Sequence, residues 1–350
     1  MININSVLTY PILTIVSTGK RSFENLGRFL KKSGDTVSRL LQPAEVNLKK
    51  SQSISQLMFR KKKKLYCIID DTLIKKFFSL FMQGAGMFFD TKIGRQIMAY
   101  RLVIGMISDG KFAIPIDCAY LFSKELTDEL DEKFPSKEDI AKAFVKTAMK
   151  LFPWAKIIIC ADGLYATEEF IRWCKENKFS AEMRMHSNRV VIYKGEKIAL
   201  KQLLQKKGIR PKGRQMARTI KATWYDMELE ITIVRRIDKK GEESIVFQCA
   251  TYNALPRQHV EAYDARWYIE KCIRTTKQKL GLQDCFSRSL KTQHSHVAAV
   301  LLAYSLAQLQ MKTHKLKNVE QAIRQLEEKN VMKLLAEFSR TDQIFGYAHA

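Results

Sequence analysis

The spacing of apolar residues changes character along the chain. Residues 21–60 carry apolar side chains every three or four positions, as at Phe23 and Leu26, which predicts a basic helical segment. Gly34 predicts a turn inside this segment, and Pro43 is expected to interrupt the pattern. Two helices around a turn fit either a DNA-reading helix-turn-helix or an ordinary helical pair, and both interpretations stay open.

From Leu65 the pattern becomes that of strands. Leu65–Ile69 is a short apolar run that ends in Asp70, Asp71 and Thr72. Two further runs, 97–107 and 112–120, flank Asp109-Gly110, a dipeptide typical of hairpin turns. Three early strands are therefore predicted.

Helices and strands alternate in the next part of the chain. Residues 136–151 and 167–177 predict helices, and 156–160 and 179–185 predict strands. The order β-β-β-α-β-α-β predicts an α/β fold in which helices flank a mixed sheet.

Residues 188–255 interrupt this order with alternating strand-like runs and predict a β-rich insertion. After Pro256 the chain is predicted to be helical over 257–280, 295–311 and 317–337. The expected organisation is a helical N-terminal segment, a main domain containing the insertion, and a C-terminal helical segment, with the bounds 1–64, 65–311 (insertion 188–255) and 312–350.

Charge narrows the class of partner. The 350 residues carry a formal net charge of +24, which attracts polyanions; nucleic acid is favoured over an anionic membrane. The basic run 60–64 fits a solvated linker or a phosphate-binding patch. The apolar run 297–309 is too short to span a bilayer, and the stretch 7–16 lacks the features of a signal peptide. Seven cysteines without a C-x-x-C pair predict reduced core residues of a cytoplasmic protein.

Carboxylates mark two strand ends. Asp71 follows the first predicted strand and Asp162 follows the strand 156–160. In an open sheet with parallel strands, that edge is where ligands bind. Aspartate is also a favoured turn residue, so either one alone has a structural explanation.

A third carboxylate lies on a predicted helix. Tyr263, Arg266, Glu270 and Lys277 are spaced by three, four and seven residues, which places them on one helix face. Taken alone, this stripe also fits an exposed face with an ion pair between Arg266 and Glu270.

The complete pattern resembles a known family. Tyr263-x2-Arg266-x3-Glu270-x6-Lys277 is similar to the Y-R-E-K signature of insertion-sequence transposases of the DDE superfamily, the group called insertion sequence family four. The surroundings of that family's two aspartates are similar to Asp71-Thr72 and to the tetrapeptide 162–165. The resemblance covers about residues 65–311 and implies an RNase H-like fold.

The resemblance also implies a chemistry. Asp71, Asp162 and Glu270 would be the catalytic residues and would hold two Mg²⁺ or Mn²⁺ ions, which prefer carboxylate oxygens and promote in-line displacement at phosphorus. Neighbouring strand residues face opposite sides, so only one of Asp70 and Asp71 is expected to reach the metals. Asp71 is chosen because the family's aspartate precedes a threonine.

The remaining expectations concern DNA. The resemblance implies that Tyr263, Arg266 and Lys277 contact phosphates of double-stranded DNA, namely terminal inverted repeats and target DNA. Trp224 and Tyr252 fit either stacking on an unpaired base or, more often, packing of a small sheet. Joining two ends predicts a homodimer on DNA in a bacterial cytoplasm, with no membrane partner.

Two other functions compete with the transposase interpretation. A structure-specific nuclease or resolvase on the same scaffold would hydrolyse DNA without joining it. A catalytically inactive derivative of a transposase would only bind DNA. The three acids and the Y-R-E-K stripe favour the transposase.

Overall fold

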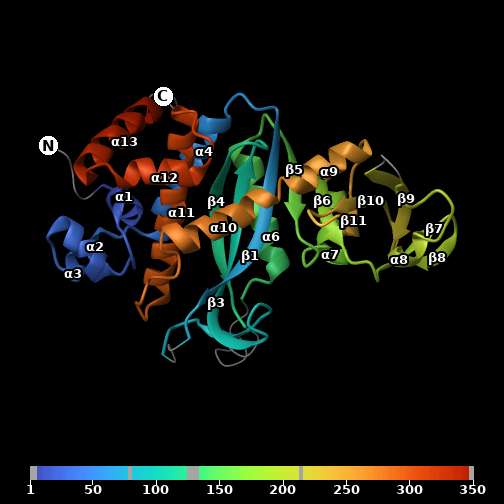
Figure 1. The fold of residues 1–350 in the computed structure, drawn as a ribbon, viewed down its shortest axis with the longest axis horizontal. Coiled ribbons are helices and arrows are strands. Elements are labelled where there is room, and N and C mark those ends of the chain that lie inside the picture. Colours follow the sequence, from blue (N-terminus) through green and yellow to red (C-terminus); the bar gives the residue numbers. More distant parts are fainter. Residues whose placement is uncertain (1–5, 78–80, 124–133, 213–215, 347–350) are drawn as a thin grey trace.

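One eleven-stranded sheet runs through the middle of the protein, with helices on both faces (Figure 1). The computed structural model describes residues 6–77, 81–123, 134–212 and 216–346. The strands are β1 (Lys64–Lys75), β2 (Gly86–Asp90), β3 (Arg95–Ser108), β4 (Ala113–Leu121), β5 (Lys156–Ala161), β6 (Ser180–Met185), β7 (Val190–Tyr193), β8 (Glu196–Ala199), β9 (Ala217–Trp224), β10 (Met227–Ile237) and β11 (Glu243–Ala250). The helices are α1 (Thr9–Val16), α2 (Phe23–Leu30), α3 (Gly34–Leu40), α4 (Ala44–Phe59), α6 (Lys137–Leu151), α7 (Glu168–Glu176), α8 (Leu200–Leu203), α9 (Pro256–Asp264), α10 (Trp267–Lys279), α11 (Leu290–Thr313), α12 (Val319–Glu327) and α13 (Val331–Gly346).

The sheet is mixed, as its sequence pattern predicts. β3 pairs antiparallel with β1, β2 and β4, whereas β1, β5 and β6 pair parallel with one another in that order. β11 continues the sheet antiparallel to β6, followed by β10, β9, β7 and β8. The β-rich insertion therefore extends the main sheet. This α/β arrangement is consistent with the RNase H-like fold that the resemblance implies.

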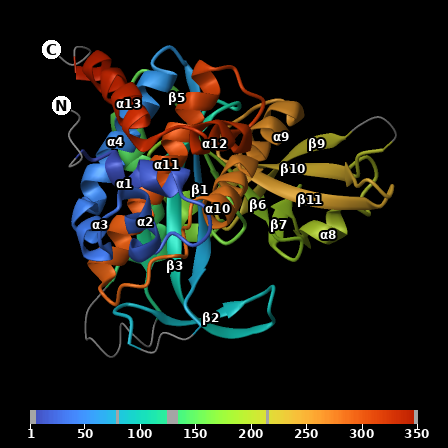
Figure 2. The same cartoon turned by 60° about the vertical axis from the view of Figure 1, so that its left-hand side comes forward.

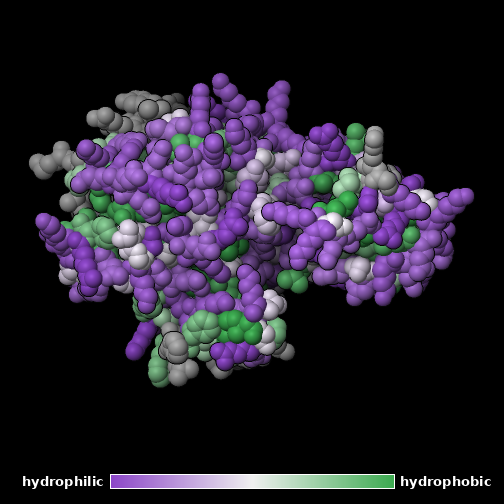
Figure 3. Space-filling view, viewed as in Figure 1, coloured by the Kyte–Doolittle hydropathy of each residue, from purple (hydrophilic) through white to green (hydrophobic). Residues whose placement is uncertain are grey.

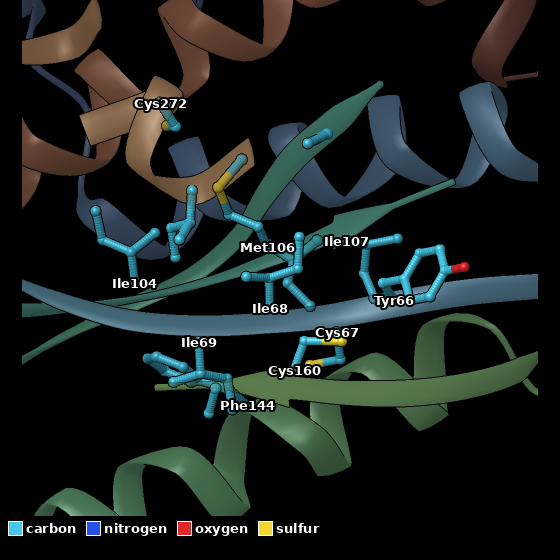
Figure 4. Packing of buried hydrophobic residues seen from close by; sticks show 14 of the residues in the cluster. Tyr66, Cys67, Ile68, Ile69, Ile104, Met106, Ile107, Phe144, Cys160 and Cys272 are labelled. Atoms are coloured by element: carbon cyan, nitrogen blue, oxygen red, sulfur yellow. The ribbon is translucent and has the colours of Figure 1, made fainter. Parts of the chain in front are cut away.

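The two faces of β1 look toward different helices. In Figure 4, Ile68 lies on the side of Cys272 of α10, and Ile69 lies on the opposite side beside Phe144 of α6. Both isoleucines are fully buried, so the register of this strand is fixed by the core on each side. The next two residues of the strand, Asp70 and Asp71, continue this alternation.

The two ends of the chain pack together. α1 and α12 pack against α11 at one end of the molecule, α13 packs on α1, and the insertion forms the other end (Figures 1 and 2). All eight residues of α1 are buried. The Tyr10 hydroxyl donates to His296 Nδ1 of α11 at 2.8 Å, and His296 Nε2 donates to the Gly281 carbonyl at 2.8 Å. The apolar stretch 7–16 is thus a core helix.

Two helix predictions were wrong in their extent. The predicted helix 257–280 is α9 and α10, separated at Ala265 and Arg266. Arg266 N bonds to the Tyr263 carbonyl, and Tyr268 N to the Ala265 carbonyl, so the ladder there tightens to i→i+3 bonds. The predicted helix 317–337 is likewise split into α12 and α13.

The N-terminal helices form a helical hairpin followed by a core helix. α2 and α3 pack on each other, with Lys31 in a left-handed conformation (φ 52°) between them. α4 packs on α11 and β4, and eight of its residues are buried. DNA reading by α2 and α3 stays a prediction.

Burial confirms one prediction from composition: all seven cysteines are buried and unpaired. Within the parts of the chain that the structure describes, no helix is both long and apolar enough to cross a membrane.

Candidate active site

Arg266 joins two of the acids that the sequence singles out. It follows α9, and its Nη1 donates to Asp70 Oδ2 at 2.9 Å. Its Nη2 pairs with Glu270 Oε1, one turn later on α10. The Arg266 side chain is only 18% exposed, so this charge lies between two partly buried carboxylates. The guanidinium thus bridges β1 and α10 across a separation of 196 residues in sequence.

Asp71 points to the other face of β1. Its Oδ2 lies 3.5 Å from Arg101 Nε of β3, a longer contact than the one that holds Asp70. The Asp70 carboxylate also accepts from the Asp71 backbone N–H at 2.9 Å. Asp70 therefore lies on the α10 face of β1 with Glu270, and Asp71 lies on the opposite face, so the choice of Asp71 from the sequence does not fit the geometry.

Asp162 directly follows the last residue of β5, near the two aspartates of β1. Ile69 of β1 pairs with Ala161, so the next residue, Asp162, is level with Asp70. Asp162 Oδ1 accepts from Leu164 N at 2.8 Å, which fixes the turn after the strand. The next residue is Gly163, and a larger side chain would be crowded there. A Cβ atom at this position would lie 3.1 Å from His186 Nε2 and 3.3 Å from the Arg184 carbonyl oxygen.

The aspartates are electrostatically coupled. Burial, followed by repulsion from Asp162, raises the pKa of Asp70 to about 7, and Arg266 acts in the opposite direction. The pKa of Asp71 is also raised, chiefly by burial, with Arg101 opposing and Asp162 adding to the shift. Three carboxylates crowded into one partly buried place are costly to ionise together without a cation.

The donor set fits hard divalent cations. Only carboxylate oxygens are offered by Asp70, Asp71, Asp162 and Glu270, and these are the ligands that Mg²⁺ and Mn²⁺ prefer. The buried Tyr165 hydroxyl beside them has no hydrogen-bond partner among the described residues. Within the same residues, no three His, Cys, Asp or Glu side chains are already gathered as a metal-binding group, and Arg266 stands between Asp70 and Glu270.

Lys277 reaches the strand that carries the aspartates. Its Nζ donates to Thr72 Oγ1 and to the Leu73 carbonyl, both at 2.7 Å. Burial, together with repulsion from Lys75 and Lys92, lowers the pKa of Lys277 to about 8. The Lys277 ammonium group beside the site therefore loses its proton more readily than an ordinary lysine.

Tyr263 belongs to the same place. It is 8% exposed, and the Arg266 guanidinium lies 5.6 Å from the centre of its ring. The structure thus brings Tyr263, Arg266, Glu270 and Lys277 to the α9–α10 side of β1, as the helical spacing predicts.

A buried ionic cluster that the sequence did not reveal holds α9 in place. His259 Nδ1 lies 2.7 Å from Glu182 Oε2 of β6, and His259 Nε2 lies 2.7 Å from Glu230 Oε2 of β10. A ring that donates from both nitrogens is the protonated imidazolium. Burial lowers the pKa of His259, but the two glutamates outweigh this effect and raise it.

The sheet register explains how this cluster assembles. Glu182, Ala250 and Glu230 are direct neighbours on β6, β11 and β10, so a small side chain lies between two glutamates. Cys160 of β5 extends the same row and donates through Sγ to the Ala262 carbonyl of α9 at 3.0 Å. α9 therefore lies across the strands from the insertion to β5 and delivers Arg266 to β1.

The aromatic residues of the insertion divide into packed and exposed rings. Trp224 is 3% exposed and is covered by the Arg189 guanidinium, 5.4 Å from its ring. Tyr252 donates from its hydroxyl to Glu182 Oε2 at 3.2 Å. Tyr225, which the sequence did not single out, is 57% exposed and lines a cavity of about 860 Å³ with Trp224, Arg189 and His186.

The sequence matches one known family of protein domains. The sequence model of the family described as Transposase DDE domain group 1 matches residues 131–338, more than half of the chain. The protein belongs to this family of DDE transposase domains. The matched region contains Asp162 and the stripe from Tyr263 to Lys277, whereas Asp70 and Asp71 precede it. A comparison with curated proteins finds no match.

Proposed function

We propose that this protein is a transposase that cleaves DNA at the ends of an insertion sequence and joins them to a target. Membership of the DDE transposase domain family supports a DNA-processing enzyme. The observation that carries the finer proposal is the placement of Glu270 and Arg266 beside the strand that bears Asp70 and Asp71, level with Asp162. The spacing from Tyr263 to Lys277 supports the Y-R-E-K group.

The proposed ligands are Asp162, Glu270 and, of the two neighbouring aspartates, Asp70. Asp70 shares Arg266 with Glu270 on the α10 face of β1, and Asp162 is level with it. Two bound Mg²⁺ or Mn²⁺ ions would activate a water or a DNA 3′-hydroxyl and stabilise the leaving oxygen. Asp71, the choice made from the sequence, instead points to the opposite face of β1, where it contacts Arg101. DDE transposases generally use divalent metals, which agrees with the oxygen-only donor set.

The cationic residues would bind the DNA backbone. Arg266 offers a guanidinium fork that suits phosphate, and it would exchange its carboxylate partners for a DNA phosphate when metal enters. Lys277 adds a point charge near Thr72, and Tyr263 offers a hydroxyl. Double-stranded terminal repeats and target DNA are the proposed substrates, synapsed by a homodimer.

The direct test is strand cleavage and joining on the element's terminal repeats with Mg²⁺ or Mn²⁺. Asp162→Asn and Glu270→Gln should abolish both steps and keep DNA binding. Asp226→Asn is the matched control, since Asp226 is an exposed residue of the turn between β9 and β10 and pairs with Arg172 of α7. Folded acid variants that still cleave would contradict the proposal.

The same assay separates the neighbouring aspartates. Asp70→Asn should abolish cleavage, whereas Asp71→Asn should lower it only in part. The rival assignment takes Asp71 as the ligand because a threonine follows it, and it predicts the reverse order of activities. Cleavage without joined products would instead identify a nuclease, and binding without cleavage a DNA-binding derivative.

A further inference from the structure

Cations from five separate segments gather along the border of the sheet where β1 and β5 begin. Arg60 to Lys64 form the connection from α4 into β1, and Lys156 opens β5, with its N–H donating to the Lys63 carbonyl at 2.8 Å. The β3–β4 turn, α10 and α11 add one lysine each. We name this set the basic edge: Arg60, Lys61, Lys62, Lys63, Lys64, Lys111, Lys156, Lys271 and Lys312.

Aromatic rings hold several of these lysines in place. Lys64 Nζ lies 5.2 Å from the centre of the Tyr66 ring, and Lys156 Nζ lies 5.5 Å from that of Tyr252. Each cation–π contact is worth about 0.5–1 kcal/mol at an exposed site and reduces the freedom of the chain that carries the charge.

The same arrangement recurs on the neighbouring segments. Lys111 and Lys312 approach the Phe112 ring at 5.4 and 5.9 Å, and Lys271 approaches Tyr268 at 5.1 Å. The Tyr268 hydroxyl in turn donates to the Gly110 carbonyl at 2.6 Å, which ties α10 to the β3–β4 turn. The basic edge is therefore a set of oriented charges on a rigid support.

Carboxylates do little to balance this charge. Within the described parts of the chain, the one salt bridge of the basic edge joins Lys62 to Asp109 at 2.8 Å, and the Asp109 side chain is only 4% exposed. Burial and the nearby charges of Lys62 and Arg60 lower the pKa of Lys312, with Asp109 opposing. Like charges held this close repel one another unless a polyanion neutralises them.

The basic edge lies away from the acids. β5 begins at Lys156 and ends just before Asp162, so the two borders are about 20 Å apart at about 3.3 Å per strand residue. In Figure 3, hydrophilic side chains cover the upper border of the molecule, where Figure 1 shows α4 running into β1. A phosphate at the acids cannot also contact this border.

We propose that the basic edge binds the phosphate backbone of duplex DNA outside the cleavage site. Lysine ammonium groups act as point charges on phosphates and do not read base edges, so this binding is independent of sequence. The proposal rests on the proposed function for the biological use of the site, but the binding itself can be measured without catalysis. The DNA is either a second duplex or a distant part of the cleaved one.

The test compares two triple variants with the same loss of charge. The first is Lys64→Gln, Lys111→Gln and Lys156→Gln, all exposed residues of the basic edge. The control is Lys206→Gln, Lys221→Gln and Lys329→Gln, exposed or partly exposed lysines paired with carboxylates elsewhere. Binding of duplex DNA of unrelated sequence is measured against salt concentration with metal chelated, after equal urea midpoints establish that the variants are folded.

The basic-edge variant should bind about tenfold or more weakly at 0.1 M salt. Its slope of log affinity against log salt should fall by about 0.9 for each lysine that contacts a phosphate. The control should match the wild type. Unchanged affinity and slope in the first variant, or equal loss in both, would overturn the proposal.

Duplex length then identifies the source of the DNA. If the basic edge holds a second duplex, the wild type binds two short duplexes and the basic-edge variant binds one. If it holds a distant part of the same duplex, the protein binds one duplex. The variant then binds more weakly than the wild type only when the duplex is long, about 40 base pairs. Either result supports the site. Failure of cleavage on terminal repeats would leave both measurements intact and would count only against the transposase proposal.

Discussion

At the scale of residues, Arg266 is the cation that partly neutralises the clustered carboxylates. Its guanidinium lies between Asp70 and Glu270, where it offsets part of the repulsion that Asp162 and Asp71 exert on Asp70. Removing one partner of a partly buried ion pair leaves an uncompensated charge, which costs more than the pair contributes. A divalent cation entering the site would take over this neutralising role.

Metal binding should therefore stabilise the protein. Mn²⁺ at about 100 times its Kd should raise the free energy of unfolding by about 2.7 kcal/mol. Asp162→Asn should abolish the gain, because it removes a carboxylate level with Asp70. Asp226→Asn, at an exposed pair with Arg172, should retain it. Urea unfolding with Mn²⁺ and with chelator measures the effect; an equal gain in Asp162→Asn would contradict the metal assignment.

Lys277 gives the site a pH dependence. Its pKa is lowered to about 8, so it is mainly charged at pH 7 and mainly neutral at pH 9.5. Lys277→Met should weaken DNA binding at pH 7 and reduce the salt slope by about 0.9. The difference from the wild type should shrink as pH rises through 8, because the wild type loses its charge there.

Lys277→Arg is the matched control, since arginine stays charged over this range. Its binding should hold between pH 7 and 9.5, measured by the same titration at constant salt. A gap between Lys277→Met and the wild type that is as wide at pH 9.5 as at pH 7 would show that Lys277 acts by packing and not by charge.

At the scale of elements, α9 connects the insertion to the catalytic strands. The His259 ring is anchored to Glu182 and Glu230, and the Ala262 carbonyl is anchored to Cys160. Arg266 follows seven residues after His259, about 10.5 Å along a helix. The buried charges thus lie on the element that positions the bridging arginine.

His259→Ala should destabilise the protein by about 3–5 kcal/mol, because two glutamates lose their cation. The loss should grow between pH 5 and pH 8. Burial already raises the pKa of Glu182 to about 7, and a carboxyl with a raised folded pKa contributes stability below its unfolded pKa and loses it as pH rises through the folded value. Urea unfolding at several pH values measures this.

His259→Leu with Glu182→Gln and Glu230→Gln serves as the comparison. It removes the charges together and should be less destabilising than His259→Ala at pH 8. If the single variant is no less stable at pH 8 than at pH 5, then the glutamates are not ionised in the folded protein and the charge-based account of the cluster is wrong.

The sequence predicted local features well. Short apolar runs that end in acids predicted β1 and β5, and helical spacing placed Arg266, Glu270 and Lys277 on one side of the site. These signals depend on neighbours a few residues apart. Asp70 and Asp71 could be assigned to opposite faces but not to particular partners, because those partners, Arg266 and Arg101, come from other elements.

The features that were missed depend on distant pairing. The row of Glu182, Ala250 and Glu230 exists only through the register of β6, β11 and β10. The turn between α9 and α10 has no glycine or proline to mark it, and both of its residues keep helical dihedral angles. The junction occurs where α9, which packs across the sheet, gives way to α10. Contacts between distant elements set that packing, and no local sequence pattern encodes them.

At the scale of the whole molecule, the chain termini share a core with the catalytic sheet. Leu8, Ile12 and Val16 of the α1 region belong to the same apolar cluster as residues of β1, α11 and α12. A division at residues 64 and 311 therefore separates segments that bury each other, whatever their roles in DNA binding. Within the insertion, the β7–β8 hairpin has fewer ties, since among the described residues β7 pairs with β9 only through Ile192 and Thr223.

Deletion of residues 1–17 should abolish cooperative unfolding. It removes five buried aliphatic side chains, each worth about 1.5–3 kcal/mol when buried, and their sum matches the about 5–15 kcal/mol that stabilises a typical protein. The five are Leu8, Ile12, Leu13, Ile15 and Val16. Replacing the β7–β8 hairpin, residues 190–199, by a short Gly-Ser loop should instead leave a cooperative transition, because few pairings hold it to the sheet. Urea unfolding followed by tryptophan fluorescence compares the two. A deletion variant that still unfolds cooperatively, with a midpoint near that of the intact chain, would show that the helical end is an accessory layer and not part of the core.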